Sequence, residues 1–320
     1  MKWGILSAAN IAKKALIPAI QRTEGAEAFA IASQSGKARE FAEQFEIPQT
    51  YESYESLLAD PNVEAVYIPL PNHLHKEWTI KAAEAGKHVL CEKPAAIHQS
   101  DVNEMIEACN QNGVYFLEAF MYQFHPQHQK VKELIDSGVI GDVSLVRASF
   151  SFYFYRSNYN IRLDAGKGGG ALWDVGCYGV HSALHLIDQE VSRVTATAKL
   201  DEEYHVDTTS SASLLLENGV IVQVDCSFDA AARNTYEVIG SEGVITVHDA
   251  YRPDKKNHEG KITVENEQGV KEFVEQGDQY SLQVENFMKA IVNKKSLETY
   301  HKETIRYLGA MEAIQEKIKK

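Results

Sequence analysis

The chain begins with the stretch KWGILSAANIA, residues 2–12, in which an apolar run is followed by small residues that open a helix-like segment. Proteins that bind a dinucleotide carry the pattern G-x-G-x-x-G or G-x-G-x-x-A at such a place. Here Ser7 and Ala9 stand at the first two glycine positions, and Ala12 stands at the third. The stretch by itself therefore leaves two interpretations open, a cofactor loop or an ordinary turn between a strand and a helix.

Each glycine of that pattern has a physical role. The first allows a tight turn, the second lets the backbone approach a pyrophosphate, and the third permits close packing of helix against strand. Alanine can fill the third role, and Ala9 adds only one methyl group at the point of approach. The Ser7 hydroxyl can donate to a phosphate oxygen, and the first turn of the helix offers N–H groups to an anion.

The composition of the whole chain limits its class. A length of 320 residues with 44% hydrophobic side chains predicts about two domains with sizeable cores. The net charge of −13 argues against a nucleic-acid partner or an anionic membrane surface, since both need clustered positive charge. It does not exclude an anionic cofactor, which needs only a local site.

The cysteines and the N-terminus indicate a compartment. The four cysteines are far apart and form no C-x-x-C pair, which is typical of reduced thiols in the cytoplasm. The sequence begins with a strand rather than with a basic and then apolar leader, and no apolar run approaches the ~20 residues of a membrane span. We therefore expect a cytoplasmic protein without a membrane segment.

Strands and helices alternate in the first third of the chain. Such alternation predicts βαβ units and a parallel sheet. The expected strands are 27–33, 63–68, 88–91 and 114–117, and the expected helices include 75–85 and 101–109, the latter with Ser100 as its N-cap.

The pattern changes near Phe124. Apolar and polar residues then alternate with period two over 148–154, 194–200 and 220–228, which indicates an antiparallel sheet with one face in a core. We expect helices near 281–292 and 302–318 to close the chain. The predicted domains are residues 1–123, an α/β dinucleotide-binding domain, and residues 124–320, an α+β domain for substrate binding and oligomerisation.

Three stretches carry a family resemblance. They are YIPLPNHLH (67–75), HVLCEKP (88–94) and GKGGGALWDVGCYGVH (166–181). In order and spacing they resemble the Gfo/Idh/MocA oxidoreductases, the family of glucose-fructose oxidoreductase and inositol dehydrogenase. The chain is most similar to the dihydrodiol and xylose dehydrogenase branch, in which Tyr replaces the usual His. The resemblance implies an N-terminal Rossmann domain, a C-terminal domain with a large, mostly antiparallel open-faced sheet, and a nicotinamide cofactor.

The residues after the second strand bear on the choice of cofactor. An NAD site usually has Asp or Glu there to hold the ribose 2′-hydroxyl. Here Ser33 and Gln34 follow the strand, Lys37 and Arg39 come next, and no carboxylate appears before Glu40. These side chains suit a 2′-phosphate, so we expect NADP to be preferred over NAD. The alternative is a solvated polar loop.

The catalytic residues are expected in two motifs. Lys93 and Pro94 follow a parallel strand at the edge where ligands of α/β proteins bind, although such a pair also occurs in surface turns. Asp174, Tyr178 and His181 are four and three residues apart, so on a helix they share one face, which suits either a pocket wall or a solvated stripe.

The resemblance assigns roles to these residues. It implies that Lys93 reaches the nicotinamide ribose and the substrate hydroxyl, and that Asp174 and Tyr178 form the catalytic pair. His181 either orients Tyr178 or lines the substrate pocket. The candidate catalytic residues are Lys93, Asp174, Tyr178 and His181. The candidate cofactor-binding residues are Ser7, Ala8, Ala9, Asn10, Ile11, Ser33, Gln34, Lys37, Arg39, Leu70, Asn72, His75, Glu92, Lys93 and Arg162. The pairs His73/His75 and His125/His128 lack further ligands, so no metal is expected.

The expected function is hydride transfer between NAD(P) and a secondary alcohol or hemiacetal of a small polyhydroxylated substrate, a sugar or a diol. Tyr178, assisted by Lys93, would exchange the hydroxyl proton. Two alternatives are a regulatory protein that senses the cofactor without turnover and an NAD-dependent glycosidase. The second face of the antiparallel sheet carries Ile221, Gln223, Ser149 and Tyr153. Because this mixture is neither polar nor apolar throughout, we expect it to pair with a second copy, giving a homodimer or a dimer of dimers.

Overall fold

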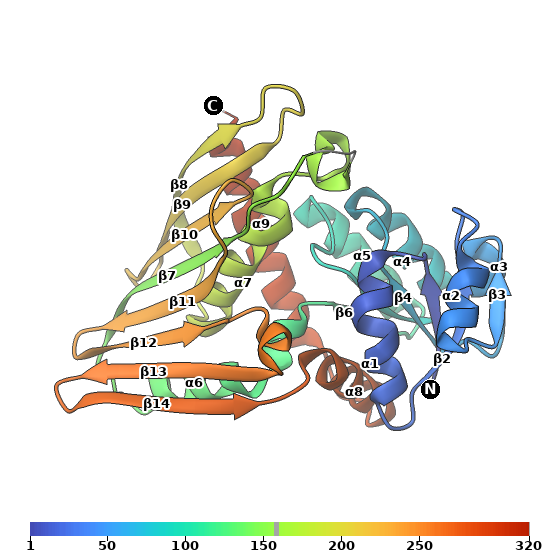
Figure 1. Ribbon diagram of the computed structural model, residues 1–320, viewed down its shortest axis with the longest axis horizontal. Helices are drawn as coiled ribbons and strands as arrows, with labels where there is room; N and C mark the ends of the chain where they lie inside the picture. Colours follow the sequence, from blue (N-terminus) through green and yellow to red (C-terminus); the bar gives the residue numbers. More distant parts are fainter. Residues whose placement is uncertain (157–159, 320) are drawn as a thin grey trace. The chain divides into compact units, whose positions relative to one another are not determined.

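The computed structural model describes residues 1–156 and 160–319, and the chain divides into two compact units (Figure 1). Unit 1 comprises residues 1–121 and 280–305, and unit 2 comprises residues 122–279 with the chain from Arg306 onward. The first boundary lies close to the predicted one at 123/124. The prediction that everything after it forms one domain is wrong, because residues 280–305 return to unit 1.

Unit 1 is built on a parallel sheet. Its strands, in the order β3-β2-β1-β4-β5-β6, are β1 (Lys2–Leu6), β2 (Glu27–Ala32), β3 (Gln49–Tyr51), β4 (Ala65–Ile68), β5 (His88–Cys91) and β6 (Phe116–Glu118). The pairings between neighbours are all parallel. Strands such as β4, AVYI, are buried along their whole length, as expected when helices cover both faces. The order reverses between β1 and β4, which confirms the doubly wound Rossmann sheet.

Helices follow most strands of unit 1. A π-helical turn (Ala12–Leu16) leads into α1 (Ile17–Arg22), and later helices are α2 (Ala38–Phe45), α3 (Tyr54–Leu58), α4 (His75–Glu84) and α5 (Gln99–Gln111). α5 begins two residues before Asp101, and its N-cap is His98 rather than the predicted Ser100.

Two late helices explain why the chain returns to unit 1. They are α8 (Gln279–Val292) and α9 (Glu298–Ile318), of which α9 belongs to unit 1 as far as Ile305. The Phe287 ring packs against Trp3 with ring centroids 5.8 Å apart. The Thr304 hydroxyl donates to Glu118 Oε2 at 2.9 Å. Contacts over such sequence distances leave no periodic signal, so the sequence predicted the helices but not their place.

Unit 2 contains an eight-stranded sheet in the order β14-β13-β12-β11-β7-β10-β9-β8. The strands are β7 (Val143–Ser151), β8 (Val191–Leu200), β9 (Asp207–Leu216), β10 (Ile221–Ser227), β11 (Arg233–Gly240), β12 (Gly243–His248), β13 (Glu259–Asn266) and β14 (Gly269–Gln276). The pairings are antiparallel except that between β7 and β10, which is parallel. Period-two alternation reports which face is buried but not strand direction, so this pair could not be predicted.

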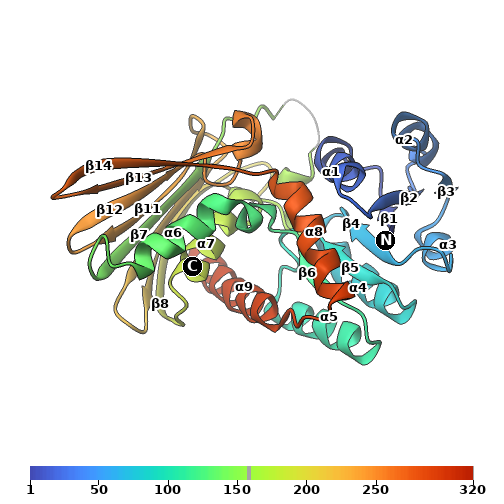
Figure 2. The same cartoon turned by 90° about the horizontal axis from the view of Figure 1, so that it is seen from below.

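Helices α6 (Pro126–Asp136) and α7 (Cys177–Leu186) lie against one face of this sheet (Figure 2). Gly179 makes the close approach of α7 possible, since a Cβ there would lie 2.8 Å from Val224 Cγ1 and 3.2 Å from Ala148 Cβ. The opposite face carries the other set of alternating side chains, and we call it the open face. The close approach of α7 to β7 and β10 fixes the helix on which Tyr178 stands.

Candidate functional site

The loop after β1 has one residue, Ser7, in a backbone conformation that glycine usually adopts. Ser7 has a φ angle of +136°, a conformation that favours glycine, so it fills the first glycine role despite its side chain. Ala8, Ala9 and Ile11 are half-buried and Asn10 is exposed. Ala12 is fully buried, as the third glycine role requires. The geometry therefore favours the anion-binding interpretation of SAANIA over an ordinary turn.

The loop after β2 exposes the groups predicted to meet a 2′-phosphate. The side chains of Gln34, Lys37 and Arg39 are exposed. Ser33 is buried, with its hydroxyl oxygen 2.8 Å from that of Ser35. Direct contact with a ligand from the Ser33 hydroxyl would thus compete with this internal hydrogen bond.

Tyr54 is a site residue that sequence reasoning missed. Burial raises the pKa of its phenol, and hydrogen bonds from the Ser7 side chain and the Gln34 backbone offset part of that rise. The phenol thus ties the loop after β1 to the loop after β2. Nothing in the helix-like stretch YESLL, in which Tyr54 is the first residue, signals that position.

The turn that carries Lys93 is held from several sides. Tyr67 donates a hydrogen bond to the Glu92 carboxylate, and the Ala95 backbone N–H donates to Glu118 Oε1 at 2.7 Å. The Lys93–Pro94 peptide bond is cis. Glu118, at the end of β6, was not predicted as a site residue because it is 25 residues from Lys93 in the sequence.

His75 links two of these loops. It is fully buried, and its ring nitrogens lie 2.8 Å from the Leu70 carbonyl oxygen and 2.9 Å from the Pro94 carbonyl oxygen. Burial lowers the pKa of His75, although the hydrogen bonds oppose this effect. Its neighbour His73 is exposed, so the two side chains do not converge as metal ligands would. Asn72 lies in the 3₁₀ turn Asn72–Leu74 just before α4.

These loops follow β1, β2, β4 and β5, whose carboxyl ends lie at one edge of a parallel sheet. Ligands of such folds bind at that edge, where the strand order reverses. The loops that carry the predicted cofactor residues of unit 1, from Ser7 to Lys93, thus share this carboxyl edge of the parallel sheet.

In unit 2, a buried carboxylate holds the start of the Tyr178 helix. Asp207 Oδ2 accepts hydrogen bonds from the Leu172 N–H at 2.8 Å and from the Ser210 hydroxyl at 2.6 Å. Gly170 has a φ of +109°, and a Cβ there would overlap Asp207 Oδ1. Burial raises the pKa of Asp207, opposed by these hydrogen bonds. Asp207 was also missed, since the first strand residue after a loop carries no special signal.

Arg162, Asp174 and Tyr178 come together in unit 2. Arg162 Nε lies 2.6 Å from Asp174 Oδ2, and the Asp174 charge raises the pKa of Arg162, with a smaller contribution of the same sign from Tyr178. Asp174 belongs to a π-helical turn (Leu172–Gly176) that precedes α7, and such turns are frequent at functional sites. The predicted face is not a solvated stripe, because Tyr178 and His181 are 6% and 3% exposed.

His181 is held inside the unit. Its Nδ1 lies 2.6 Å from the Tyr122 hydroxyl oxygen. Burial lowers the pKa of His181 well below its usual value, with smaller contributions from His185 and Arg306. A neutral, buried imidazole suits a positioning role better than exchange of protons with solvent.

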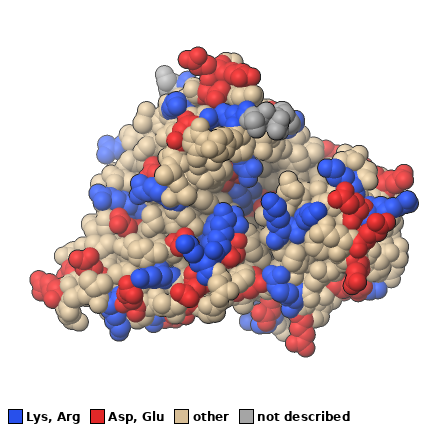
Figure 3. Space-filling model, viewed as in Figure 1, with Lys and Arg blue, Asp and Glu red and all other residues tan. Residues whose placement is uncertain are grey.

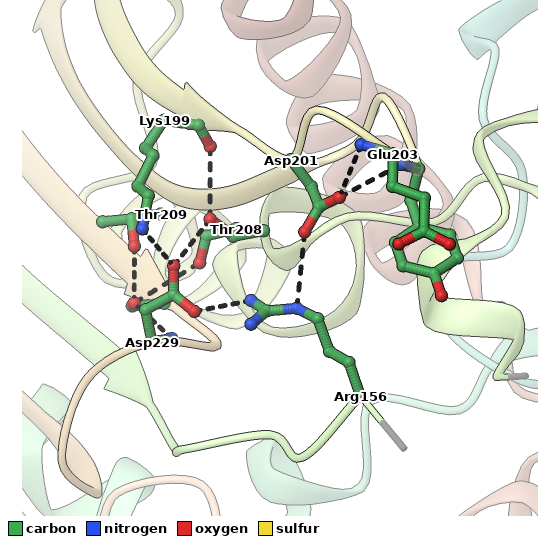
Figure 4. Close-up of polar contacts among 9 residues, drawn as sticks. Arg156, Lys199, Asp201, Glu203, Thr208, Thr209 and Asp229 are labelled. Atoms are coloured by element: carbon green, nitrogen blue, oxygen red, sulfur yellow. Dashed lines mark hydrogen bonds and ion pairs between the residues drawn. The ribbon is translucent and has the colours of Figure 1, made fainter. Parts of the chain in front are cut away.

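A second polar cluster fixes the chain just before residue 157 (Figure 4). Arg156 Nη2 donates to Asp229 Oδ1 at 2.5 Å, and its Nε lies 3.6 Å from Asp201 Oδ2. Lys199 and Thr208 donate to Asp229 Oδ2 at 3.0 and 2.8 Å. These contacts join the ends of β8, β9 and β10 to Arg156.

Two further observations concern partners. Among residues 1–156 and 160–319, no group of three or more His, Cys, Asp or Glu side chains is arranged to hold a metal ion. Within the same residues, none of the helices has the length and apolar character needed to cross a membrane. Acidic and basic side chains are interspersed on the face that Figure 3 shows.

Comparison with known families places both parts of the chain. A family model described as an oxidoreductase family with an NAD-binding Rossmann fold matches residues 1–120. A second, described as the GFO/IDH/MocA C-terminal domain, matches residues 128–246.

Individual proteins resemble the chain over most of its length. The D-xylose 1-dehydrogenase (NADP(+)) 2 of Haloferax volcanii is 37% identical over 99% of this chain and 97% of its own. The trans-1,2-dihydrobenzene-1,2-diol dehydrogenase of Mus musculus is 33% identical over 79% of this chain and 76% of its own. The crystal structure of KijD10, a 3-ketoreductase from Actinomadura kijaniata in complex with NADP and TDP-benzene, has a TM-score of 0.94 at 29% identity, covering 99% of this chain and 98% of that one.

Proposed function

The chain belongs to the Gfo/Idh/MocA family of oxidoreductases, and we propose that it transfers hydride between NADP and a secondary alcohol or hemiacetal carbon of a sugar or diol. The observation that carries the proposal is the cluster of Arg162, Asp174 and Tyr178 at the start of α7. Relatives named as xylose, dihydrodiol and ketosugar enzymes support this substrate class.

The residues of unit 1 fit a dinucleotide. Ser7, at positive φ, gives the tight turn, and the strand order reverses between β1 and β4, where ligands of such folds bind. Gln34, Lys37 and Arg39 would hold the 2′-phosphate, since they are exposed where an NAD site carries an acid. When bound, the nicotinamide supplies the hydride acceptor or donor.

The chain's own residues would handle the proton. Tyr178 would exchange it with the substrate hydroxyl, and Lys93 would act on the same hydroxyl from its fixed turn. Asp174, already paired with Arg162, would keep the polar groups around the phenol in one arrangement. Positioned acid–base groups of this kind typically contribute 10²–10⁴-fold to the rate.

The first experiment is a substrate panel. Pentoses, hexoses and vicinal diols are incubated with NADP⁺ and with NAD⁺, and the absorbance of the reduced nicotinamide is followed. We expect net reduction of NADP⁺ with at least one member. No net reduction with any member would instead favour a cofactor-sensing protein. An aryl glycoside is added to the panel, and its cleavage without net reduction would favour an NAD-dependent glycosidase.

The second experiment tests the assigned proton carrier. We expect Tyr178→Phe to lower kcat by about 10²–10⁴-fold with little change in cofactor Kd. Lys93→Met should lose as much or more, and the double variant should be little worse than Lys93→Met alone, as for groups that act as a unit. Wild-type kcat in Tyr178→Phe would reject this role for the phenol.

A third experiment tests cofactor choice. Ser33→Asp places a carboxylate just after β2, where it would repel a 2′-phosphate, so we expect the ratio of kcat/KM for NADP⁺ over NAD⁺ to fall below one. Ser35→Ala is the matched control, since it removes the hydrogen-bond partner of Ser33 without adding charge. A wild-type enzyme that prefers NAD⁺ tenfold would contradict the proposed cofactor.

A further inference from the structure

The Tyr178 ring is surrounded by other aromatic rings of unit 2. Phe150 of β7 lies edge-on to it, with centroids 5.3 Å apart and an interplanar angle of 64°. The Tyr251 ring lies 5.3 Å away and the Tyr122 ring 5.9 Å away, both tilted. Aromatic rings at these separations attract one another and restrict ring rotation.

Two of these neighbours are tied back to the same helix. The Tyr122 hydroxyl lies 2.6 Å from His181 Nδ1, and the Tyr251 hydroxyl lies 2.9 Å from Ser182 Oγ. Ser182 Oγ itself donates to the Gly179 carbonyl at 3.1 Å, so Tyr251 is the donor to Ser182. His181 and Ser182 follow Tyr178 by three and four residues, which places them one turn further along α7 on the same side.

Because these two hydroxyl contacts are buried, they restrict the orientation of the Tyr122 and Tyr251 rings. Tyr122 and Tyr251 are fully buried, and His181 and Ser182 are 3% and 1% exposed. A buried hydroxyl that loses its partner cannot turn to water, so each ring has one favoured arrangement. The Tyr122 ring also lies 5.3 Å from that of Tyr251, which joins the two supports to each other.

We propose that Tyr122 and Tyr251 are positioning residues for Tyr178, and we call the pair the tyrosine clamp. Each ring contacts the Tyr178 ring, and each hydroxyl is anchored to the helix turn that follows it. The clamp thus fixes both the direction of the phenol and the rotation of α7 beneath it. This inference rests on the proposed role of Tyr178 as proton carrier.

The test removes each hydroxyl and keeps each ring. Tyr122→Phe and Tyr251→Phe are made in the wild type and in Tyr178→Phe. We expect each to lower kcat about tenfold with KM changed less than about threefold, since small displacements of a reacting group are costly. In Tyr178→Phe the same changes should leave the residual kcat unaltered, because the group they position is gone.

Tyr236→Phe is the matched control. Tyr236 is a fully buried tyrosine whose hydroxyl lies 2.8 Å from His128 Nδ1, so the change deletes the same kind of Tyr–His hydrogen bond, but on α6 and β11 rather than on α7. The Tyr236 ring lies 6.3 Å from that of Tyr251 and the His128 ring 4.9 Å from that of Tyr122, and Tyr236→Phe keeps both rings. We expect it to lower the midpoint of urea unfolding as much as Tyr122→Phe does, with kcat unchanged. Should Tyr251→Phe not fold, Ser182→Ala removes the partner of the same hydroxyl from the helix side.

Each of the following results would overturn the clamp. Unchanged kcat in both hydroxyl variants, with lowered unfolding midpoints, would make the two tyrosines core residues only. An equal loss of kcat in the Tyr178→Phe background would mean that they act through another group. Full activity of Tyr178→Phe would overturn the proposed function and the clamp together, whereas an inactive Tyr178→Phe with fully active Tyr122→Phe and Tyr251→Phe would overturn the clamp alone.

Discussion

Ser7 is the residue at which the first loop departs most from a glycine pattern. Its φ of +136° is costly for any residue with a Cβ, and such strain amounts to about 1–3 kcal/mol. The hydrogen bond of its hydroxyl to the Tyr54 phenol offsets part of this cost. Strain held in place by a specific contact is common at ligand-binding sites.

Two substitutions separate the strain from the hydrogen bond. Ser7→Gly removes both, whereas Ser7→Ala keeps the strain and removes only the bond. We expect the free energy of unfolding to be about 1–2 kcal/mol higher for Ser7→Gly than for Ser7→Ala. Urea unfolding of the two variants measures the difference, and equal stabilities would mean that the loop relaxes to negative φ.

At the scale of elements, the Asp229 carboxylate links the ends of β8, β9 and β10 in unit 2 through hydrogen bonds and ion pairs. Burial on its own would raise the pKa of Asp229, but the hydrogen bonds from Arg156, Lys199 and Thr208 outweigh it and lower the pKa to about 2. The Asp229 side chain is 21% exposed, so solvent weakens these interactions only in part. Asp229 therefore stabilises the fold while it is ionised.

This arrangement predicts a pH dependence. Between about pH 4 and pH 2 the unfolded chain binds the Asp229 proton and the folded chain does not, so the stabilisation is complete above pH ~4 and is lost as the pH falls. We expect Asp229→Asn to cost about 2 kcal/mol of unfolding free energy at pH 7 and less at pH 3. Asp201→Asn, on the other side of Arg156, is the control, and a pH-independent cost would contradict the charge argument.

At the scale of the whole molecule, the open face of unit 2 is the surface that we expect to contact a second copy of the chain. Paired strands place a row of aliphatic side chains across it, namely Leu215, Ile221, Leu145, Ile239 and Val244. Beside the row lies a polar hollow of about 600 Å³ whose lining includes Arg147, Asp225, Arg233 and Glu237. An aliphatic row next to charges of both signs suits a two-fold contact, in which each surface meets its own copy.

We propose that the chain forms a homodimer, or a dimer of dimers, through this face. Ile221, at the start of β10, is 41% exposed on this face. A charge there would have to be buried in the contact between copies, so Ile221→Glu is expected to shift the protein to a smaller species in light scattering at micromolar concentration. Val292→Glu is the control, because Val292 is 72% exposed on α8 of unit 1. A wild-type monomer under these conditions would contradict the proposal.

Much of the architecture could be predicted because its causes are local. β5 begins and ends at the expected residues, His88 and Cys91, since a buried run between Gly86 and the E-K-P turn permits little else. α8 and α9 were expected near 281–292 and 302–318, and the structure begins α9 earlier, at Glu298. The expected N-cap at Ser100 was wrong because the position of the cap depends on the backbone geometry of His98, which composition does not report.

The sequence by itself determined the two kinds of sheet, because the alternation of strands with helices and the period-two runs are local patterns along the chain. The family, and the importance of the motifs that hold Ser7, Lys93, Asp174 and Tyr178, followed from the resemblance of three short stretches to known oxidoreductases. Tertiary structure alone decided which residues support those motifs. Tyr54, Glu118, Asp207, Tyr122 and Tyr251 act through contacts with residues distant in sequence. The return of α8 and the start of α9 to unit 1, and the parallel pairing of β7 with β10, also depend on such contacts. The physical reason is that a hydrogen bond or ring contact depends on distance in space, and folding brings these groups together without leaving a pattern in the order of the residues.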